Sequence, residues 1–164
     1  NENDLASGIH GVNIRPATNQ DSDAIIAVVD ACYRQYPYQL YVEDEPELLT
    51  PADSFSAFWV AEDTEGLVGC IAGQLLQDAT ELKKFYAHPR AWGTGLAQEL
   101  HQKFVQWTRE EGRASAVLWT DVLFHRAHKF YKKQGWVNTG KTRDLADTNG
   151  PFSEYLLTLN NIAV

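Results

Sequence analysis

The stretch that decides the fold is residues 81–112, ELKKFYAHPRAWGTGLAQELHQKFVQWTREEG. It opens with a run of β-forming residues and continues through a glycine-containing loop at residues 92–95. From Leu96 the apolar residues recur at helical spacing until Gly112, which is a typical helix stop. A strand, a glycine loop and a helix in this order bring free backbone amides and the positive end of the helix dipole together. This arrangement favours a site for an anion such as a diphosphate.

The flanking sequence predicts a sheet with helices on its faces. Two β-rich runs, 57–61 and 67–72, are joined by a turn at 63–66 and predict a hairpin. The imperfect alternation of residues 81–87 indicates a strand with a bulge. Further strands are expected at 12–15, 116–120, 136–142 and 153–159, and helices over Ile25, Val28, Val29, Cys32 and Tyr36 and over 125–134. The predicted fold is a single-domain α/β structure with a mixed, mostly antiparallel sheet flanked by helices.

Composition excludes several classes of function. The 164 residues suffice for one domain, expected at residues 11–164 after a loose polar tail at residues 1–10. The chain carries 22 acidic and 14 basic residues, a formal charge of −8, so neither nucleic acid nor an anionic membrane is an expected partner. The apolar stretch 66–76 is too short for a membrane span and no leader is recognisable, so a cytoplasmic location is expected. Two cysteines, Cys32 and Cys70, are too few for a disulfide scaffold or a thiolate zinc site.

A second glycine motif points to a different function. Residues 135–142, GWVNTGKT, match the nucleotide-binding pattern G-x-x-x-x-G-K-[ST] letter for letter. That pattern binds phosphates where a strand precedes the loop and a helix follows it. Here a helical pattern precedes Gly135, and the sequence after Thr142 has little apolar periodicity. The motif is therefore interpreted as a helix stop followed by a strand, with an ATP or GTP loop as a remote alternative.

The first glycine loop resembles the acetyl-CoA loop of the GNAT N-acetyltransferase superfamily. That family loop reads [Q/R]-x-x-G-x-[G/A] after a strand that ends in hydrophobic-x-Pro. Here Ala87-His88-Pro89 ends the strand, and Gly95 and Ala97 take the two small-residue positions. Trp92 stands where glutamine or arginine is usual.

Two other segments extend the resemblance over residues 12–160. Residues 126–136, RAHKFYKKQGW, are similar to the family segment r-A-x-x-[L/F]-Y-x-x-x-G-[F], and residues 13–18, NIRPAT, to its first strand and helix start. Phe124 stands where many members have an asparagine that contacts the cofactor. The order and spacing of the three segments together make the resemblance specific.

The resemblance implies a role for each part of the site. A cosubstrate, acetyl-CoA, would be held by Phe85, Tyr86, Ala87, Trp92, Gly93, Thr94, Gly95, Leu96 and Ala97. Tyr131 stands at the position of the tyrosine that commonly protonates the leaving thiolate, and a tyrosine with a pKa near 10 is protonated at neutral pH. Because an alkylamine is mostly protonated there too, a base is useful, and Glu81 on the strand is the candidate. A solvated carboxylate at the strand start is the alternative for Glu81.

The expected activity is transfer of an acetyl group from acetyl-CoA to the primary amine of a small-molecule or amino-acid-like acceptor, directly within a ternary complex. A catalytically silent acyl-CoA-binding or regulatory domain is the alternative, which the departures at Trp92 and Phe124 keep open. No metal is expected, since His125 and His128 lack an obvious third ligand. The protein is expected to act as a monomer or homodimer. The acidic cluster at 43–47 is read as a binding lip or a solvated loop.

Overall fold

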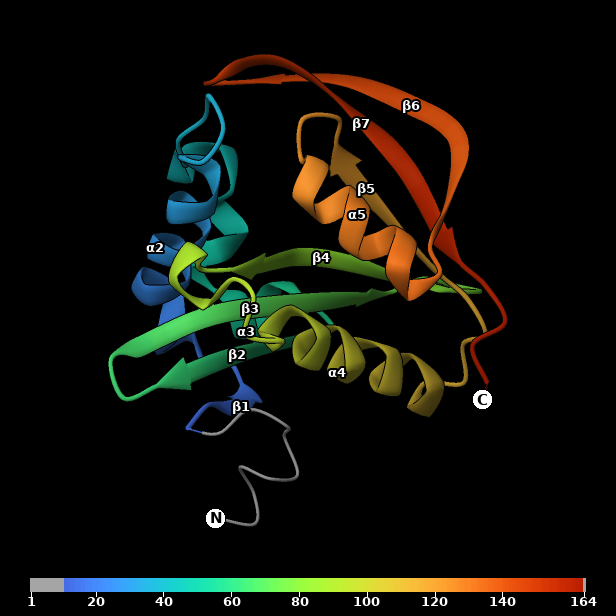
Figure 1. Ribbon diagram of the computed structural model, residues 1–164, viewed down its shortest axis with the longest axis horizontal. Helices are drawn as coiled ribbons and strands as arrows, with labels where there is room; N and C mark the ends of the chain where they lie inside the picture. Colours follow the sequence, from blue (N-terminus) through green and yellow to red (C-terminus); the bar gives the residue numbers. More distant parts are fainter. Residues whose placement is uncertain (1–10, 164) are drawn as a thin grey trace.

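Seven strands form one mixed sheet in the computed structural model, which describes residues 11–163 (Figure 1). The spatial order is β1-β2-β3-β4-β5-β7-β6, and among the described strands only the β4–β5 pair is parallel. The tail expected at residues 1–10 lies outside the described residues. The strands are β1 (Asn13–Pro16), β2 (Ala57–Asp63), β3 (Gly66–Leu75), β4 (Thr80–Ala87), β5 (Ala116–Asp121), β6 (Val137–Asp147) and β7 (Gly150–Leu159).

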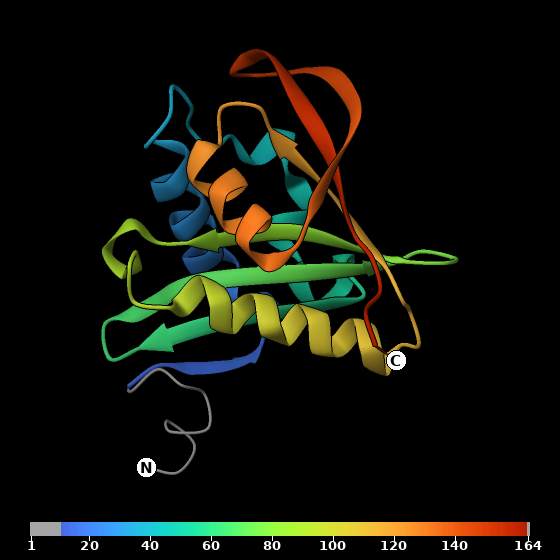
Figure 2. The same cartoon turned by 45° about the vertical axis from the view of Figure 1, so that its right-hand side comes forward.

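Helices cover both faces of the sheet (Figure 1 and Figure 2). On one face, Ile25 and Val29 of α2 (Ser22–Tyr33) are fully buried in one apolar cluster. On the other face, Leu100 and Phe104 of α4 (Leu96–Glu110) are buried in a second cluster, which also contains Tyr131 of α5 (His125–Gln134). Full burial of one such apolar side chain stabilises by about 1.5–3 kcal/mol. The remaining turns are η1 (Asn19–Asp21), η2 (Val42–Asp44), η3 (Pro46–Leu49), α3 (Pro51–Ser54) and η4 (Pro89–Ala91).

The predicted fold class is confirmed, together with the β2–β3 hairpin and the helix that starts at Leu96. The interpretation of residues 135–142 as a helix stop and a strand is also confirmed. Gly135 ends α5 with φ 98°, a conformation that glycine adopts without strain, and β6 follows. With a helix before it and a strand after it, this segment cannot form the nucleotide loop that its letters suggest.

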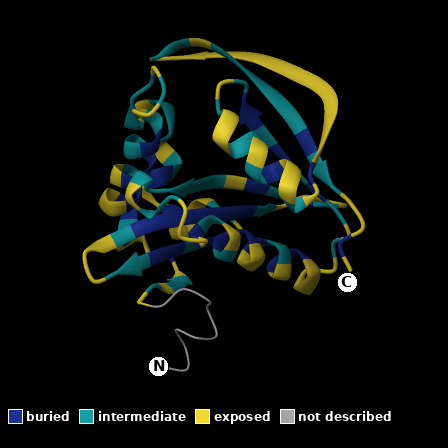
Figure 3. Ribbon diagram, viewed as in Figure 1, coloured by how far each residue is buried: buried dark blue, intermediate teal, exposed yellow. Residues whose placement is uncertain are grey.

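Several predicted boundaries are wrong. The first helix ends at Tyr33 and does not reach Tyr36, because the Asp30 carboxylate accepts the backbone N–H of Leu40 and the chain turns there. The strand expected at 136–142 continues to Asp147, and the last strand starts at Gly150. Since β6 is exposed along its whole length (Figure 3), its sequence shows no apolar alternation, and its pairing with β7 defines it.

β4 separates from β5 soon after both strands begin. The parallel pairing ends at Glu81, opposite Val117. Beyond it the register of β4 on β3 shifts, which confirms the predicted bulge, and Lys84 there has φ 50°. A bulge bends its strand and increases its twist. The later backbone groups of β4 are thus left without a partner on the β5 side.

The tip of the β6–β7 hairpin meets the loop that follows α2 (Figure 1). The Asn149 side chain accepts the backbone N–H of Gln39 at 3.1 Å and donates to its carbonyl at 2.8 Å. Thr148 donates through its backbone N–H and its hydroxyl to the Asp44 carboxylate, at 3.1 and 3.0 Å. Segments about a hundred residues apart in the sequence therefore enclose the space beside the separated strands.

Candidate active site

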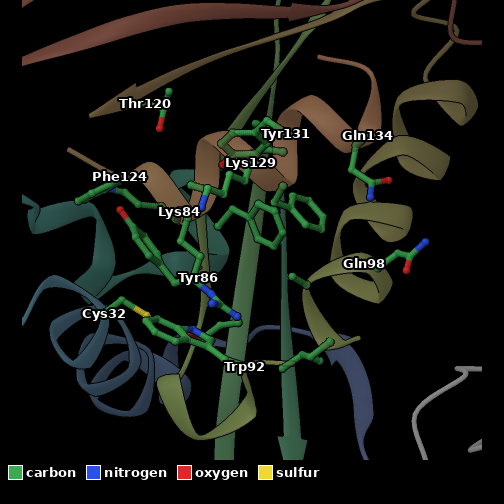
Figure 4. A pocket seen from close by; sticks show the side chains of 18 of the residues that line it. Cys32, Lys84, Tyr86, Trp92, Gln98, Thr120, Phe124, Lys129, Tyr131 and Gln134 are labelled. Atoms are coloured by element: carbon green, nitrogen blue, oxygen red, sulfur yellow. The ribbon is translucent and has the colours of Figure 1, made fainter. Parts of the chain in front are cut away.

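A cleft of about 580 Å³ lies where β4 and β5 separate, between the start of α4 and α5 (Figure 4). Its size is in the range of small-molecule sites. Tyr86 and Lys84 of β4, Phe124 at the start of α5, and Tyr131 within α5 line it, with Trp92 towards the glycine loop. The unpaired backbone of β4 supplies donors and acceptors along one wall, as an extended ligand with amide groups requires.

The loop end of the cleft is built to bind an anion. Gly93 and Gly95 have φ values of 79° and 90°, which favour glycine. Within the described residues, the backbone N–H groups of Gly93, Gly95 and Ala97 donate no hydrogen bond; Ala97 is in the first turn of α4, whose amides have no acceptor within the helix. The helix dipole adds partial positive charge at the same place. Of the cationic side chains that line the cleft, α5 supplies Arg126, Lys129 and Lys133.

Trp92 takes an unexpected part in this end of the cleft. Its indole N–H donates to the Ala87 carbonyl at 2.9 Å, at the last residue of β4. The Arg126 guanidinium carbon lies 4.2 Å from the centroid of the Trp92 ring, a cation–π contact. α5 thus supplies a guanidinium beside the position where the family motif has glutamine or arginine.

Tyr131 lies on the wall that α5 contributes. Its side chain is buried against Phe85 and Trp136, with ring centroids 6.2 and 5.9 Å away. Burial raises the pKa of its hydroxyl above the ordinary value of 10. That hydroxyl makes no hydrogen bond to the described residues, yet it is not sealed from solvent. It is a protonated donor that faces the cleft.

A second cavity of about 390 Å³ adjoins the cleft, and we call it the acceptor cavity. It lies between β4, the residues after α2 and the β6–β7 hairpin. The two cavities share eight lining residues: Leu82, Lys83, Lys84, Tyr86, Trp119, Asp121, Phe124 and Glu154. A molecule in the cleft and a molecule in the acceptor cavity can therefore meet at this common wall.

Carboxylates outnumber cations around the acceptor cavity. Lys84 donates to Glu45 at 2.6 Å and to Glu47 at 2.8 Å, and these partners outweigh its burial, so its pKa is raised. Arg143 bonds Glu154 at 2.7 Å. Within the described residues, four further carboxylates of the cavity form no ion pair: Asp44, Glu81, Asp121 and Asp147.

A chain of hydrogen bonds joins the common wall to this acidic region. The Tyr86 hydroxyl donates to the Tyr33 hydroxyl at 3.4 Å, and Tyr33 donates to Glu45 at 2.7 Å. Burial raises the pKa of both tyrosines well above 10, which keeps both hydroxyls neutral. This chain of hydrogen bonds holds Glu45, and with it Lys84, at the bulge of β4.

The structure brings most of the predicted site residues together. Lining the cleft are Phe85, Tyr86, Ala87, Trp92, Gly93, Gly95, Leu96, Ala97 and Tyr131. Thr94 does not line it, and its hydroxyl donates to the Ala91 carbonyl at 2.5 Å. Glu81 lines the acceptor cavity and not the cleft. Sequence reasoning missed Arg126 and Asp121, although Arg126 stands inside the motif that carried the resemblance.

A family model described as "Acetyltransferase (GNAT) family" matches residues 24–136. The chain belongs to this family of acetyl-CoA-dependent acetyltransferases. The resemblance found in the sequence is therefore confirmed, and acetyl-CoA is the cosubstrate of the family. Free backbone amides, cationic side chains and the unpaired strand β4 all border the cleft.

Individual relatives agree with this assignment. An N-acetylaspartate synthetase of Danio rerio is 30% identical over 91 residues, a match that covers 54% of this chain and 32% of that relative. The chain thus matches only about a third of that protein's length. An acetyltransferase structure from Streptococcus agalactiae has a TM-score of 0.78 at 19% identity, covering 93% of this chain and 99% of that one.

A structure described as an acetyltransferase of Salmonella typhimurium with its cofactor acetyl-CoA has a TM-score of 0.66 at 15% identity, covering 92% of this chain and 94% of that one. This likeness shows a shared fold. Between residues 11 and 163, no three His, Cys, Asp or Glu side chains gather as a metal site. No described helix is long and apolar enough to cross a membrane.

Proposed function

We propose that the protein transfers the acetyl group of acetyl-CoA directly to the primary amine of a small-molecule or amino-acid-like acceptor, within a ternary complex. The observation that carries this proposal is the pair of cavities that share one wall. Because the two cavities adjoin and each also has lining residues of its own, thioester and amine can be present together. Direct transfer needs no further carrier for the acetyl group.

Transfer through an acetylated cysteine is the alternative to direct transfer. The properties of the Cys32 thiol argue against it. This side chain lines the cleft, and it donates a hydrogen bond to the Ala87 carbonyl at 3.1 Å. Burial raises the pKa of the thiol to about 12. The thiolate is the nucleophilic form, so a thiol that stays protonated at neutral pH is a poor acyl acceptor.

The remaining roles follow from position. The amides of Gly93, Gly95 and Ala97, with Arg126, Lys129 and Lys133, would hold the phosphates. Tyr131 would donate a proton to the departing thiolate. Backbone groups of β4 around Phe85 and Tyr86 would bind the pantetheine arm and polarise the thioester carbonyl, an effect on the order of 3 kcal/mol in comparable sites.

A carboxylate of the acceptor cavity would take the proton of the acceptor ammonium. The sequence singled out Glu81 for this role, and its place in the acceptor cavity is compatible with it. The excess of carboxylates there attracts cationic acceptors. It also raises the pKa of a bound amine, so a proton acceptor close to the amine matters.

The test begins with thermal unfolding in the presence of acetyl-CoA and, separately, of Mg-ATP. A ligand at 100 times its dissociation constant stabilises by about 2.7 kcal/mol, and we expect this shift with acetyl-CoA alone. Release of the CoA thiol is then measured across a panel of amines. A shift with Mg-ATP and none with acetyl-CoA would overturn the proposal.

The same measurements separate the enzyme from its alternative. Stabilisation by acetyl-CoA without thiol release for any amine would indicate a silent acyl-CoA-binding domain. Arg126→Ala provides the control for the cleft, because it removes the guanidinium from Trp92 and leaves the acceptor cavity unchanged. We expect this variant to bind acetyl-CoA more weakly while the Michaelis constant for the amine stays close to its original value.

A further inference from the structure

The common wall of the two cavities is where the reacting atoms of two substrates have to meet. Four of its residues carry charge: Lys83, Lys84, Asp121 and Glu154. Lys83 is exposed, and Lys84 and Glu154 are held in ion pairs within the protein. Asp121 is 6% exposed and forms no ion pair within residues 11–163. It is the buried charge of this wall for which the described chain supplies no cation.

The contacts of the Asp121 carboxylate come from neutral groups. Its Oδ1 accepts the backbone N–H of Leu123 at 2.9 Å. Burial, followed by the hydrogen bond to Asp121, raises the pKa of Tyr38, whose hydroxyl is therefore a neutral donor. Asp121 lines both cavities, so its carboxylate borders cavity space on the side away from these donors. A carboxylate removed from bulk water is costly unless a cation compensates it.

We propose that Asp121 binds the ammonium group of a cationic alkylamine acceptor and takes its proton, the role for which the sequence made Glu81 a candidate. This inference rests on the proposed function. Asp121 lines both cavities, whereas Glu81 lines only the acceptor cavity and sits at the β4 end that still pairs with β5. Asp121 is therefore the carboxylate in reach of an amine that attacks a thioester in the cleft.

The walls around Asp121 suit an alkylammonium ion. The rings of Tyr38 and Phe124 lie 6.2 Å apart, and Tyr86 and Trp119 complete an aromatic lining. Cations bind to the faces of such rings. Asp44, Glu81 and Asp147 line the same cavity without ion pairs, and of its three cations Lys84 and Arg143 are ion-paired while Lys83 is exposed. A diamine fits this charge pattern, and an acceptor with additional carboxylates is repelled by it.

Each proton and electron pair in the proposed transfer has a donor and an acceptor. Asp121 takes one proton from the ammonium, and the neutral amine nitrogen uses its lone pair to form a C–N bond to the thioester carbonyl carbon. The C–S bond breaks with its electron pair on sulfur, and the sulfur receives the proton of Tyr131. The nitrogen loses its second proton, which restores Tyr131, and Asp121 releases the first proton to solvent. The products are the amide, the CoA thiol and one proton.

The test compares Asp121→Asn with Glu81→Gln, and uses Asp78→Asn in the exposed β3–β4 turn as the control for introducing an amide. Thiol release is followed with three acceptors: an alkyl diamine, an acidic amino acid and an arylamine that is uncharged at neutral pH. We expect wild type to prefer the diamine. We expect Asp121→Asn to lower kcat/KM for the diamine about 100-fold, and for the arylamine much less, since a general base contributes about 10²–10⁴-fold where a proton has to be removed. Glu81→Gln is expected to lose less than Asp121→Asn.

Binding measurements keep the inference falsifiable if Asp121→Asn loses activity for another reason. Its thermal shift with acetyl-CoA should equal that of wild type, and inhibition of the diamine reaction by tetramethylammonium should weaken in this variant. Full diamine turnover by Asp121→Asn, or equal losses with diamine and arylamine, would overturn the role of Asp121. Neither result would contradict the proposed function. Absence of acetylation of any amine by wild type would overturn the proposed function and this inference together.

Discussion

His101 makes the fold sensitive to acid in a defined pH range. The residue lies in α4, is 3% exposed, and its Nε2 accepts the indole N–H of Trp136 at 2.9 Å. Burial lowers the pKa of His101 from 6.5 to about 4. Its ring is 6.3 Å from that of Phe85 and 5.5 Å from that of Phe130, so it supports two residues of the cleft wall.

The size of the stability loss on acidification follows from the linkage between proton binding and folding. The unfolded chain binds a proton on this histidine below about pH 6.5, whereas the folded chain does so only below about pH 4. Because the unfolded state binds more protons in between, the stability that a neutral His101 contributes is complete above pH 6.5 and is lost as the pH falls to 4. At 1.36 kcal/mol per pKa unit, the loss is on the order of 3 kcal/mol.

Urea unfolding at steps from pH 7.5 to 4.5 measures this loss. His101→Gln keeps an acceptor for Trp136 and cannot take up a proton, so we expect its stability to vary less over this range. His125→Gln, at an exposed position of α5, is the matched control and should follow wild type. Parallel curves for wild type and His101→Gln would refute the reasoning, because the acid sensitivity would then come from other groups.

Three more perturbations test parts of the cleft. Tyr131→Phe should lower kcat about 100-fold without changing stability measurably, since the hydroxyl has no partner among the described residues; steady-state kinetics and urea unfolding check this. Gly95→Ala forces φ 90° on an alanine, and should cost about 1–2 kcal/mol of stability and weaken acetyl-CoA binding in a titration. Glu45→Gln removes a 2.6 Å ion pair from Lys84, and should cost about 2 kcal/mol in urea unfolding.

Most of the fold could be predicted because its signals are local. The apolar stripe of α4, the glycine after α5 and the turn of the β2–β3 hairpin each depend on residues close together in the chain. The strand β6 was predicted too short because it is an exposed edge strand, held by pairing with β7 and not by an apolar pattern. The rejection of the motif at 135–142 succeeded because it used the neighbouring elements and not the letters alone.

The candidate site, like the fold, has parts that local sequence predicts and parts that depend on long-range contacts. The sequence alone predicted the strand followed by the glycine loop, and separately Tyr131, because each stands within a motif of one short continuous segment. The tertiary structure alone decided which carboxylate lies at the common wall. Asp121, Tyr38 and Glu81 come from distant segments. Pairing in the β-sheet and the two hydrogen bonds between Asn149 and Gln39 bring them around one cavity. Such long-range contacts leave no periodic pattern in the sequence, since they depend on where whole strands pack.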